Sequence, residues 1–360
     1  MINKINIKNY RGISNLQLSD LMPINILLGD NNCGKTSVLE VIKSAESAEN
    51  IVGWSSLLRR NMFVPRFMDG MSVYEGFLDL FNVDKEEKYF EYEICGDEYK
   101  HVVVKMQESI EELTEAEYQQ IMRQKKYDDS FETVVVNKIE YWIYVNDTNT
   151  DHGTIYDGQP TLSREKKLQA KGNKSVFVSA TKHVDAQIYL HDILNDPKLY
   201  QEMLSVLKIY DSGIMSINYD RSSQGMGTRG VYKILSENHA EALPLNLYGD
   251  GMKKAILLMS AVIKARGGIL LLDEFETAIH TSAMKETFRW ILETCKKLNV
   301  QIFMTTHSIE AISKVLTCSE EILEDMAVYT LYKNEANIKV RRLDGKTALE
   351  AKEDMGLELR

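Results

Sequence analysis

The chain has 360 residues, of which 44% are hydrophobic and 27% charged, and this is ample for a buried core in one large or two domains. It has no apolar run of bilayer length, no secretory hydrophobic segment and four scattered cysteines, so we expect a soluble cytoplasmic protein without a membrane span, a disulfide framework or a zinc site. The formal net charge of −10 argues against nonspecific coating of nucleic acid, which depends on neutralising phosphates, although a local basic groove stays open.

The first segment predicts two strands joined by a turn. Residues 2–9 alternate apolar and polar side chains, residues 14–19 read in the same way, and Tyr10-Arg11-Gly12 lies between them. Alternation of this kind is typical of strands with one buried face.

A glycine-rich loop follows the next strand. The apolar run at 24–28 predicts a buried strand, and residues 38–46 predict a helix. Between them lies Gly29-Asp30-Asn31-Asn32-Cys33-Gly34-Lys35-Thr36-Ser37, which fits the phosphate-binding pattern G-x-x-x-x-G-K-[ST] in its required context. A plain glycine turn with an incidental lysine is the alternative, but it does not account for the flanking strand and helix.

The chemistry of this loop suits a nucleoside triphosphate with Mg²⁺. Backbone N–H groups and the positive end of the following helix would hold the β- and γ-phosphates, Lys35 would add a charge, and Thr36 would ligate Mg²⁺. Arg11 could reach a phosphate while Tyr10 stacks on adenine, or the turn could be structural with Tyr10 packed inward; both interpretations are open. The nucleotide-binding residues predicted here are Gly29, Asn31, Asn32, Cys33, Gly34, Lys35, Thr36, Ser37 and Arg11.

The middle of the chain has a different pattern. β-rich runs predict an antiparallel meander, and Thr114 and Glu117 form a capping box that begins one helix within it. Residues 147–174 predict a mobile loop. The runs are at 89–94, 101–106, 131–136 and 139–145.

The pattern then returns to alternating strands and helices. Residues 175–179 predict a buried strand, and residues 184–209 are mainly helical with a break at Pro197. Two further strands follow at 214–219 and 231–235. We therefore expect three regions: the first part of a head at 1–84, an inserted β-rich lobe and loop at 85–174, and the second part of the head at 175–360.

An apolar strand at 268–272 ends in Asp273 and Glu274. In a nucleotide-binding sheet this places Asp273 at the carboxyl end of a strand beside the phosphate loop, where it would hold Mg²⁺ and its water shell. Glu274 would then orient the attacking water as general base. Surface acids that cap a strand would explain the pair on its own, but behind a phosphate loop the catalytic interpretation is favoured.

Two further segments suggest contacts to the γ-phosphate. The buried strand at 300–304 is followed by Thr305-Thr306-His307-Ser308, where His307 would sense that phosphate, although an isolated histidine is usually structural. The turn with Gly249, Asp250 and Gly251 opens an apolar helix and offers a second anion site. One chain needs one such site for its own triphosphate, so we expect this turn to bind the nucleotide of a second chain in a dimer; a plain helix start is the alternative.

In this order the motifs resemble those of ATP-binding-cassette (ABC) ATPases. They correspond to a Walker A loop at 29–36, a signature at 249–254, a Walker B strand at 269–274, a D-loop at 275–280 and a switch histidine at His307. The opening at 5–12 and the Gly-Asp-Asn-Asn loop resemble the RecF and SMC group, and 276–280 and 305–308 are typical of AAA family ATPases related to the OLD (overcoming lysogenization defect) proteins. The resemblance covers residues 1–50 and 243–345.

This resemblance implies an α/β fold, namely an ABC-type P-loop head with a mixed β-sheet flanked by helices and an inserted antiparallel β lobe. Two departures matter. Tyr248 and Gly249 stand where the signature has a serine, so we expect slow ATP hydrolysis. The OLD nucleases continue into a Toprim nuclease domain, whereas this sequence ends at Arg360, so we expect no nuclease in this polypeptide.

The resemblance leads to a functional hypothesis and an alternative. The first is an ATP-driven switch: a homodimer or higher oligomer closes on Mg·ATP and controls a separate effector, a nuclease or a toxin, in bacterial anti-phage defence. The alternative is a RecF-like clamp that closes on DNA in repair or recombination, with basic residues at 59–66 or 164–174 facing the dimer groove. An autonomous nuclease is not expected, because no compact acidic cluster remains once Asp273 and Glu274 are assigned.

Overall fold

The computed structural model describes residues 1–54, 57, 72–122, 133–159, 174–180, 190–220, 231–334 and 337–355. The chain folds into two compact units, each assembled from separated segments. The first contains Met1–Leu21, Asn31–Asn173 and Leu331–Val340. The second contains Met22–Asp30, Lys174–Thr330 and Arg341–Arg360.

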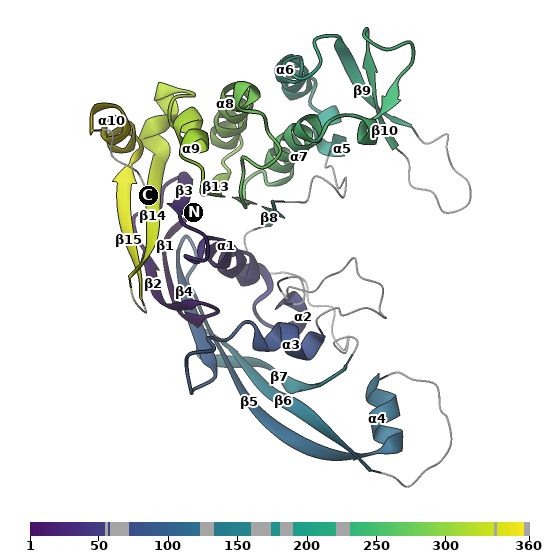
Figure 1. The fold of residues 1–360 in the computed structure, drawn as a ribbon, viewed down its shortest axis with the longest axis vertical. Helices are drawn as coiled ribbons and strands as arrows, with labels where there is room; N and C mark the ends of the chain where they lie inside the picture. Colours follow the sequence, from purple (N-terminus) through teal and green to yellow (C-terminus); the bar gives the residue numbers. More distant parts are fainter. Residues whose placement is uncertain are drawn as a thin grey trace. The chain divides into compact units, whose positions relative to one another are not determined.

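The first unit is built on a six-stranded antiparallel sheet (Figure 1). Ile5 and Ile7 are buried on β1, as the alternating pattern predicts. β1 pairs with β2 on one side and with β4 on the other, so the meander continues the N-terminal sheet. The strand order is β2 (Ile13–Leu18), β1 (Ile2–Tyr10), β4 (Tyr89–Gly96), β5 (Lys100–Thr114), β6 (Thr133–Val145) and β7 (Thr148–Tyr156).

Aromatic side chains attach short helices to this sheet. Trp54 packs against Phe90 at 5.5 Å between ring centroids, and Phe77 packs against Tyr141 at 5.7 Å. The predicted capping box at Thr114 is confirmed, since Thr114 and Glu117 exchange hydrogen bonds. The helices are α1 (Lys35–Ser44), η1 (Ala45–Ser47), α2 (Ile51–Trp54), α3 (Val73–Leu78) and α4 (Glu115–Met122).

Two predictions for the meander were wrong. The described residues of the runs at 131–136 and 139–145 belong to one strand, β6, because the polar pair Asn137-Lys138 stays in the ladder opposite Ile110 and Ser109. Residues 148–156, assigned to a loop, form β7. A two-residue turn with positive φ at Asn146 (48°) and Asp147 (63°) makes that hairpin, and both values suit a type I′ turn.

The second unit contains most of a second sheet, which holds the Walker B strand; Leu331–Val340 of this sheet belong to the first unit. β3, β13, β12 and β8 are parallel, and every residue of β3, β12 and β13 is buried. β13 lies between β12 and β3, so the Walker B strand is one strand away from the strand that leads into the phosphate loop. The full order is β15 (Asn337–Asp344), β14 (Met326–Asn334), β3 (Ile24–Gly29), β13 (Gln301–Thr306), β12 (Ile269–Leu272) and β8 (Ser175–Val178).

Helices complete the second unit, with a small sheet of three strands. The break predicted at Pro197 is confirmed: Pro197 begins α6, and Asp196 caps it by accepting a hydrogen bond from the Leu199 N–H. The small sheet has the order β11 (Leu243–Pro244), β10 (Val231–Ser236) and β9 (Ile214–Asp220). The helices are α5 (Leu190–Leu194), α6 (Pro197–Leu207), η3 (Leu245–Leu247), α7 (Asp250–Lys264), α8 (Thr281–Lys297), α9 (Ile309–Leu316), η4 (Glu320–Asp325) and α10 (Gly345–Met355).

Candidate nucleotide site

The phosphate loop joins β3 to α1. β3 ends at Gly29 and α1 begins at Lys35, with positive φ at Gly29 (148°), Asn32 (62°) and Gly34 (88°). Gly34 is also sterically required, because a Cβ there would lie 3.0 Å from Ile13 Cγ1. The tightly curled backbone is the conformation that the glycine pattern predicts.

The first turn of α1 has the electrostatics of an anion site. It contains no acidic residue, so no carboxylate offsets the positive end of the helix dipole. Lys35 is buried, and its Nζ lies 3.7 Å from Cys33 Sγ. Burial raises the pKa of the Cys33 thiol, which therefore stays protonated beside the lysine. Thr36 is half-buried, and Ser37 is buried. Residues 31–37 belong to the first unit.

Arg11 is held by the helix that follows the loop. Its Nε lies 2.8 Å from Glu40 Oε2 on α1, and both side chains are buried. Its Nη2 donates to the Leu57 carbonyl at 3.0 Å. Tyr10 is fully buried, with its ring 5.1 Å from that of Phe90. In this conformation Tyr10 packs inward and Arg11 anchors α1, which favours the structural interpretation of the turn over contact with nucleotide.

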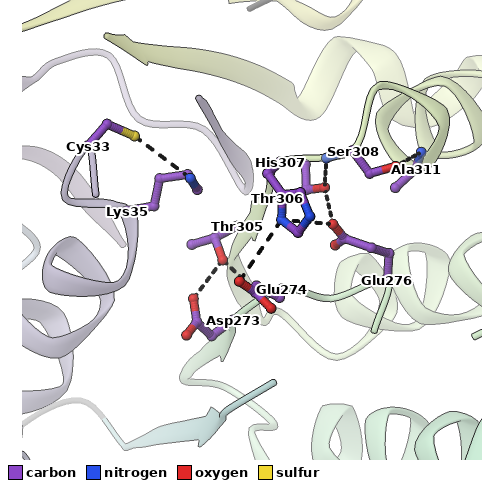
Figure 2. A network of polar contacts seen from close by, with 10 residues as sticks. All are labelled: Cys33, Lys35, Asp273, Glu274, Glu276, Thr305, Thr306, His307, Ser308 and Ala311. Atoms are coloured by element: carbon purple, nitrogen blue, oxygen red, sulfur yellow. Dashed lines mark hydrogen bonds and ion pairs between the residues drawn. The ribbon is translucent and has the colours of Figure 1, made fainter. Parts of the chain in front are cut away.

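A hydroxyl group from the neighbouring strand contacts both acidic residues of the Walker B segment. Thr305, near the end of β13, donates a 2.7 Å hydrogen bond from Oγ1 to Asp273 Oδ1. Thr305 Oγ1 also accepts a hydrogen bond from the Glu274 N–H at 2.8 Å (Figure 2). Glu274 has φ of 42°, an uncommon value for a residue with a side chain, and its carboxylate is 42% exposed. The hydroxyl group of Thr305 thus fixes the carboxylate of Asp273 and the backbone of Glu274.

His307 lies between two carboxylates. Its Nδ1 is 3.8 Å from Glu276 Oε1 and 4.0 Å from Glu274 Oε1. Thr306 holds Glu276 by donating to Oε1 at 2.6 Å, so Glu276 is fixed while His307 remains 47% exposed (Figure 2). The structure therefore brings Asp273, Glu274 and His307 together within the second unit.

Three further residues, Thr305, Thr306 and Glu276, contact the predicted site residues, and their motifs alone predict no role for them. The signal for them is a pair of hydroxyl side chains at the end of a buried strand, opposite an acidic segment on the next strand. Buried hydroxyl groups at that edge need hydrogen-bond partners. Thr305 donates to Asp273, and Thr306 donates to Glu276.

The signature turn begins α7. Gly249 is the N-cap residue, with φ of −61° and no side-chain cap. Asp250 in the first turn pairs with Lys253 at 2.6 Å. Gly251 packs against the D-loop of its own chain, since a Cβ there would lie 3.0 Å from the Ala278 carbonyl oxygen. The turn therefore has an open glycine, Gly249, and a confined one, Gly251.

The predicted ligands suit Mg²⁺ in kind. Thr36 would supply a hydroxyl oxygen and Asp273 a carboxylate oxygen, and Mg²⁺ prefers a few such oxygens together with phosphate oxygens and water. Within the described ranges, no three His, Cys, Asp or Glu side chains form a cluster that would hold a metal ion without a nucleotide. Over the same ranges no helix is long and apolar enough to cross a bilayer.

Comparison with known families identifies the class of protein. Residues 24–313 match the family described as "AAA domain, putative AbiEii toxin, Type IV TA system". The chain belongs to this AAA family. This AAA protein is 22% identical over 347 residues to an "ATP/GTP phosphatase" of Helicobacter pylori, covering 87% of this chain and 86% of the relative. It is 30% identical over 113 residues to the uncharacterized protein MJECL11 of Methanocaldococcus jannaschii, covering 31% of this chain and 98% of that protein.

Solved structures show the fold of this AAA protein. An SMC head bound to the C-terminal winged-helix domain of ScpA aligns with 97% of this chain and 99% of its own, at 12% identity and a TM-score of 0.53. An SMC head with an extended coiled coil, bound to the C-terminal domain of ScpA from Pyrococcus furiosus, aligns with 99% of both chains at 10% identity and a TM-score of 0.50. The predicted membership of the AAA family and the predicted α/β fold, which is similar to that of SMC heads, are confirmed.

Proposed function

We propose that this protein hydrolyses ATP with Mg²⁺, and that ATP binding closes a homodimer that controls a partner effector. The observation that carries the proposal is the bridge from Thr305 to Asp273 and Glu274. In this proposal the Asp273 carboxylate, which Thr305 fixes, would hold the metal, and Glu274, whose side chain is 42% exposed, would serve the attacking water.

Each residue has a role in this proposal. Glu274 orients the attacking water and accepts its proton, and His307 donates a hydrogen bond to the γ-phosphate. Lys35 and the N-terminus of α1 bind the phosphates. Mg²⁺ on Thr36 and Asp273 would neutralise charge on the β- and γ-phosphates. The Gly249–Gly251 turn binds the nucleotide of the second chain, and because it lacks a serine we expect slow turnover.

Two of the comparisons support control of a partner. The family description includes the words "putative AbiEii toxin, Type IV TA system", and the similar SMC heads are bound to ScpA. We infer an effector protein, a toxin or a nuclease, in bacterial defence. The DNA-clamp alternative depends on basic residues at 59–66 or 164–174, of which the structure describes only Lys174, so it stays a prediction from the sequence.

Hydrolysis and assembly of the purified chain test the proposal. Lys35→Ala should lose nucleotide binding, because it removes the charge that faces the phosphates. Glu274→Gln should bind Mg·ATP but hydrolyse it at least about a hundredfold more slowly, and it should accumulate as a dimer in light scattering. Lys346→Met, which removes an exposed ion pair with Glu324, is the control. Undiminished turnover by Glu274→Gln, or a monomer with ATP bound, would overturn the corresponding part of the proposal.

A further inference from the structure

A buried lysine lies beside the Walker B carboxylates. Lys254, near the start of α7, has no exposed surface, and its Nζ donates a 3.0 Å hydrogen bond to the Ala180 carbonyl. Ala180 lies just beyond β8, whose Val178 is opposite Leu272 and accepts a hydrogen bond from the Asp273 N–H. The ammonium group of the signature helix is therefore placed where β8 and the Walker B strand end.

The surroundings of Lys254 are acidic. Burial lowers the pKa of Lys254 to about 8, while the negative charges of Glu276, Asp273 and Glu274 favour its protonated form. Glu276 uses Oε1 to accept from Thr306, but Oε2 is buried and accepts no hydrogen bond from the described part of the chain. A buried carboxylate oxygen without a donor is costly, and an ammonium group nearby is the donor that would satisfy it.

A second contact connects α7 to the segment that follows the Walker B strand. Gly251, one turn before Lys254, packs against the Ala278 carbonyl of the D-loop. Ala278 itself has φ of 70°, an uncommon conformation held by its surroundings. Movement of the N-terminus of α7 would thus act on the D-loop through its backbone and on Glu276 through charge.

We propose that Lys254 is a positioning residue that couples the signature turn to the Walker B carboxylates of its own chain. When the turn engages a phosphate and α7 moves, the ammonium group shifts from the Ala180 carbonyl toward Glu276 Oε2. Glu276 Oε1 lies 3.8 Å from His307 Nδ1, which lies 4.0 Å from Glu274 Oε1. The shift of the ammonium group therefore changes the positions of His307 and Glu274, the groups proposed to contact the γ-phosphate and water. The inference rests on the proposed function, because it requires the turn to bind a nucleotide.

The experiment is a double-mutant cycle between Lys254 and Glu276. Lys254→Met keeps the length and the apolar stem but removes the charge, and Glu276→Gln keeps the shape of the carboxylate. Lys254→Met should lower kcat roughly tenfold while the affinity for a fluorescent ATP analogue changes less than about twofold. The double variant should be no slower than Lys254→Met, and Lys254→Arg should recover part of the rate.

A parallel measurement keeps this inference separate from the proposed function. Thermal unfolding without nucleotide should show coupling of the same two substitutions, with the double variant more stable than Lys254→Met. Lys346→Met with Glu324→Gln, an exposed lysine–glutamate pair, is the matched control cycle and should be additive. Additive effects of Lys254 and Glu276 on unfolding, or wild-type kcat in Lys254→Met, would overturn the inference. Absence of hydrolysis in the wild type together with coupling in unfolding would overturn the proposed function and leave the Lys254–Glu276 link in place.

Discussion

Thr305 donates a 2.7 Å hydrogen bond to Asp273, and the same hydroxyl oxygen accepts the N–H of Glu274 at 2.8 Å. One side chain from β13 thereby fixes both acidic residues at the end of β12. Thr305 is fully buried, so no solvent molecule can replace these hydrogen bonds without rearrangement. The hydroxyl also helps to hold Glu274 at its positive φ.

Replacement of this hydroxyl should therefore affect stability and catalysis together. Thr305→Val keeps the shape but leaves the Glu274 N–H unpartnered, which costs about 1–3 kcal/mol of unfolding free energy. We expect turnover to fall by roughly tenfold or more, because Asp273 and Glu274 lose their relative orientation. Thr305→Ser, which retains the hydroxyl, should stay near the wild type in both properties. Denaturant unfolding measures the stability of these variants, and single-turnover hydrolysis measures their catalytic rate. A Thr305→Val protein that hydrolyses ATP at the wild-type rate would refute the role of Thr305 in catalysis.

The sequence was most informative where burial and chemistry coincide. The strands before the phosphate loop and before Asp273 are continuous apolar runs, because parallel strands covered on both faces leave no place for alternation. The glycine pattern likewise predicts the positive φ at Gly34, where a side chain would collide with Ile13. These features depend on local residues, so a single sequence is enough to recognise them.

Other features depend on partners outside the segment itself. β7 has a polar sequence and becomes a strand because β6 offers it a ladder after the Asn146-Asp147 turn. The order of β3, β13 and β12 is set by crossovers that no local pattern encodes. Arg11 could have faced either a phosphate or a carboxylate, and in this structure it pairs with Glu40 on α1.

The Arg11–Glu40 ion pair should contribute to folding rather than to nucleotide affinity. Both groups are buried, so removal of one partner leaves an uncompensated charge and should cost about 3–5 kcal/mol. We expect Arg11→Met and Glu40→Gln to lower the urea midpoint, and to leave ATP affinity unchanged wherever the protein is still folded. If Arg11 does contact a phosphate, Arg11→Met will weaken ATP binding and Glu40→Gln will not.

The open glycine of the signature turn suggests a gain-of-function change. A Cβ at Gly249 meets no atom within 4 Å, and its φ of −61° suits any residue. Gly249→Ser should therefore fold, and its hydroxyl should cap α7 and add a few tenths of a kcal/mol of stability. If the turn binds the γ-phosphate of a second chain, turnover should rise several-fold, because the added hydroxyl would contribute roughly 1 kcal/mol to binding of the transition state.

Gly251 is the matched control for this change. Gly251→Ser places its Cβ 3.0 Å from the Ala278 carbonyl oxygen, so the D-loop must shift and stability should fall. Unfolding and steady-state hydrolysis of both variants provide the comparison. A Gly249→Ser protein that is stable but no faster would argue against contact between the turn and a phosphate.

The stability of the nucleotide-free chain should increase with pH through the titration of Lys254. Its pKa in the folded chain is about 8, below the ordinary value of 10.5, because burial disfavours the charge. Between these values the unfolded chain binds the proton more tightly than the folded chain does, so raising the pH favours folding. The free energy of unfolding of the wild type, relative to Lys254→Met, should rise by about 2 kcal/mol between about pH 7 and about pH 9.5. Subtracting the values of Lys254→Met cancels the contributions of the tyrosines, the cysteines and the other lysines to the pH dependence of the unfolding free energy. Measurement in EDTA prevents metal ions from binding to Asp273. A difference that does not change over this range would mean that Lys254 keeps its proton in the folded chain, held by Glu276, Asp273 and Glu274.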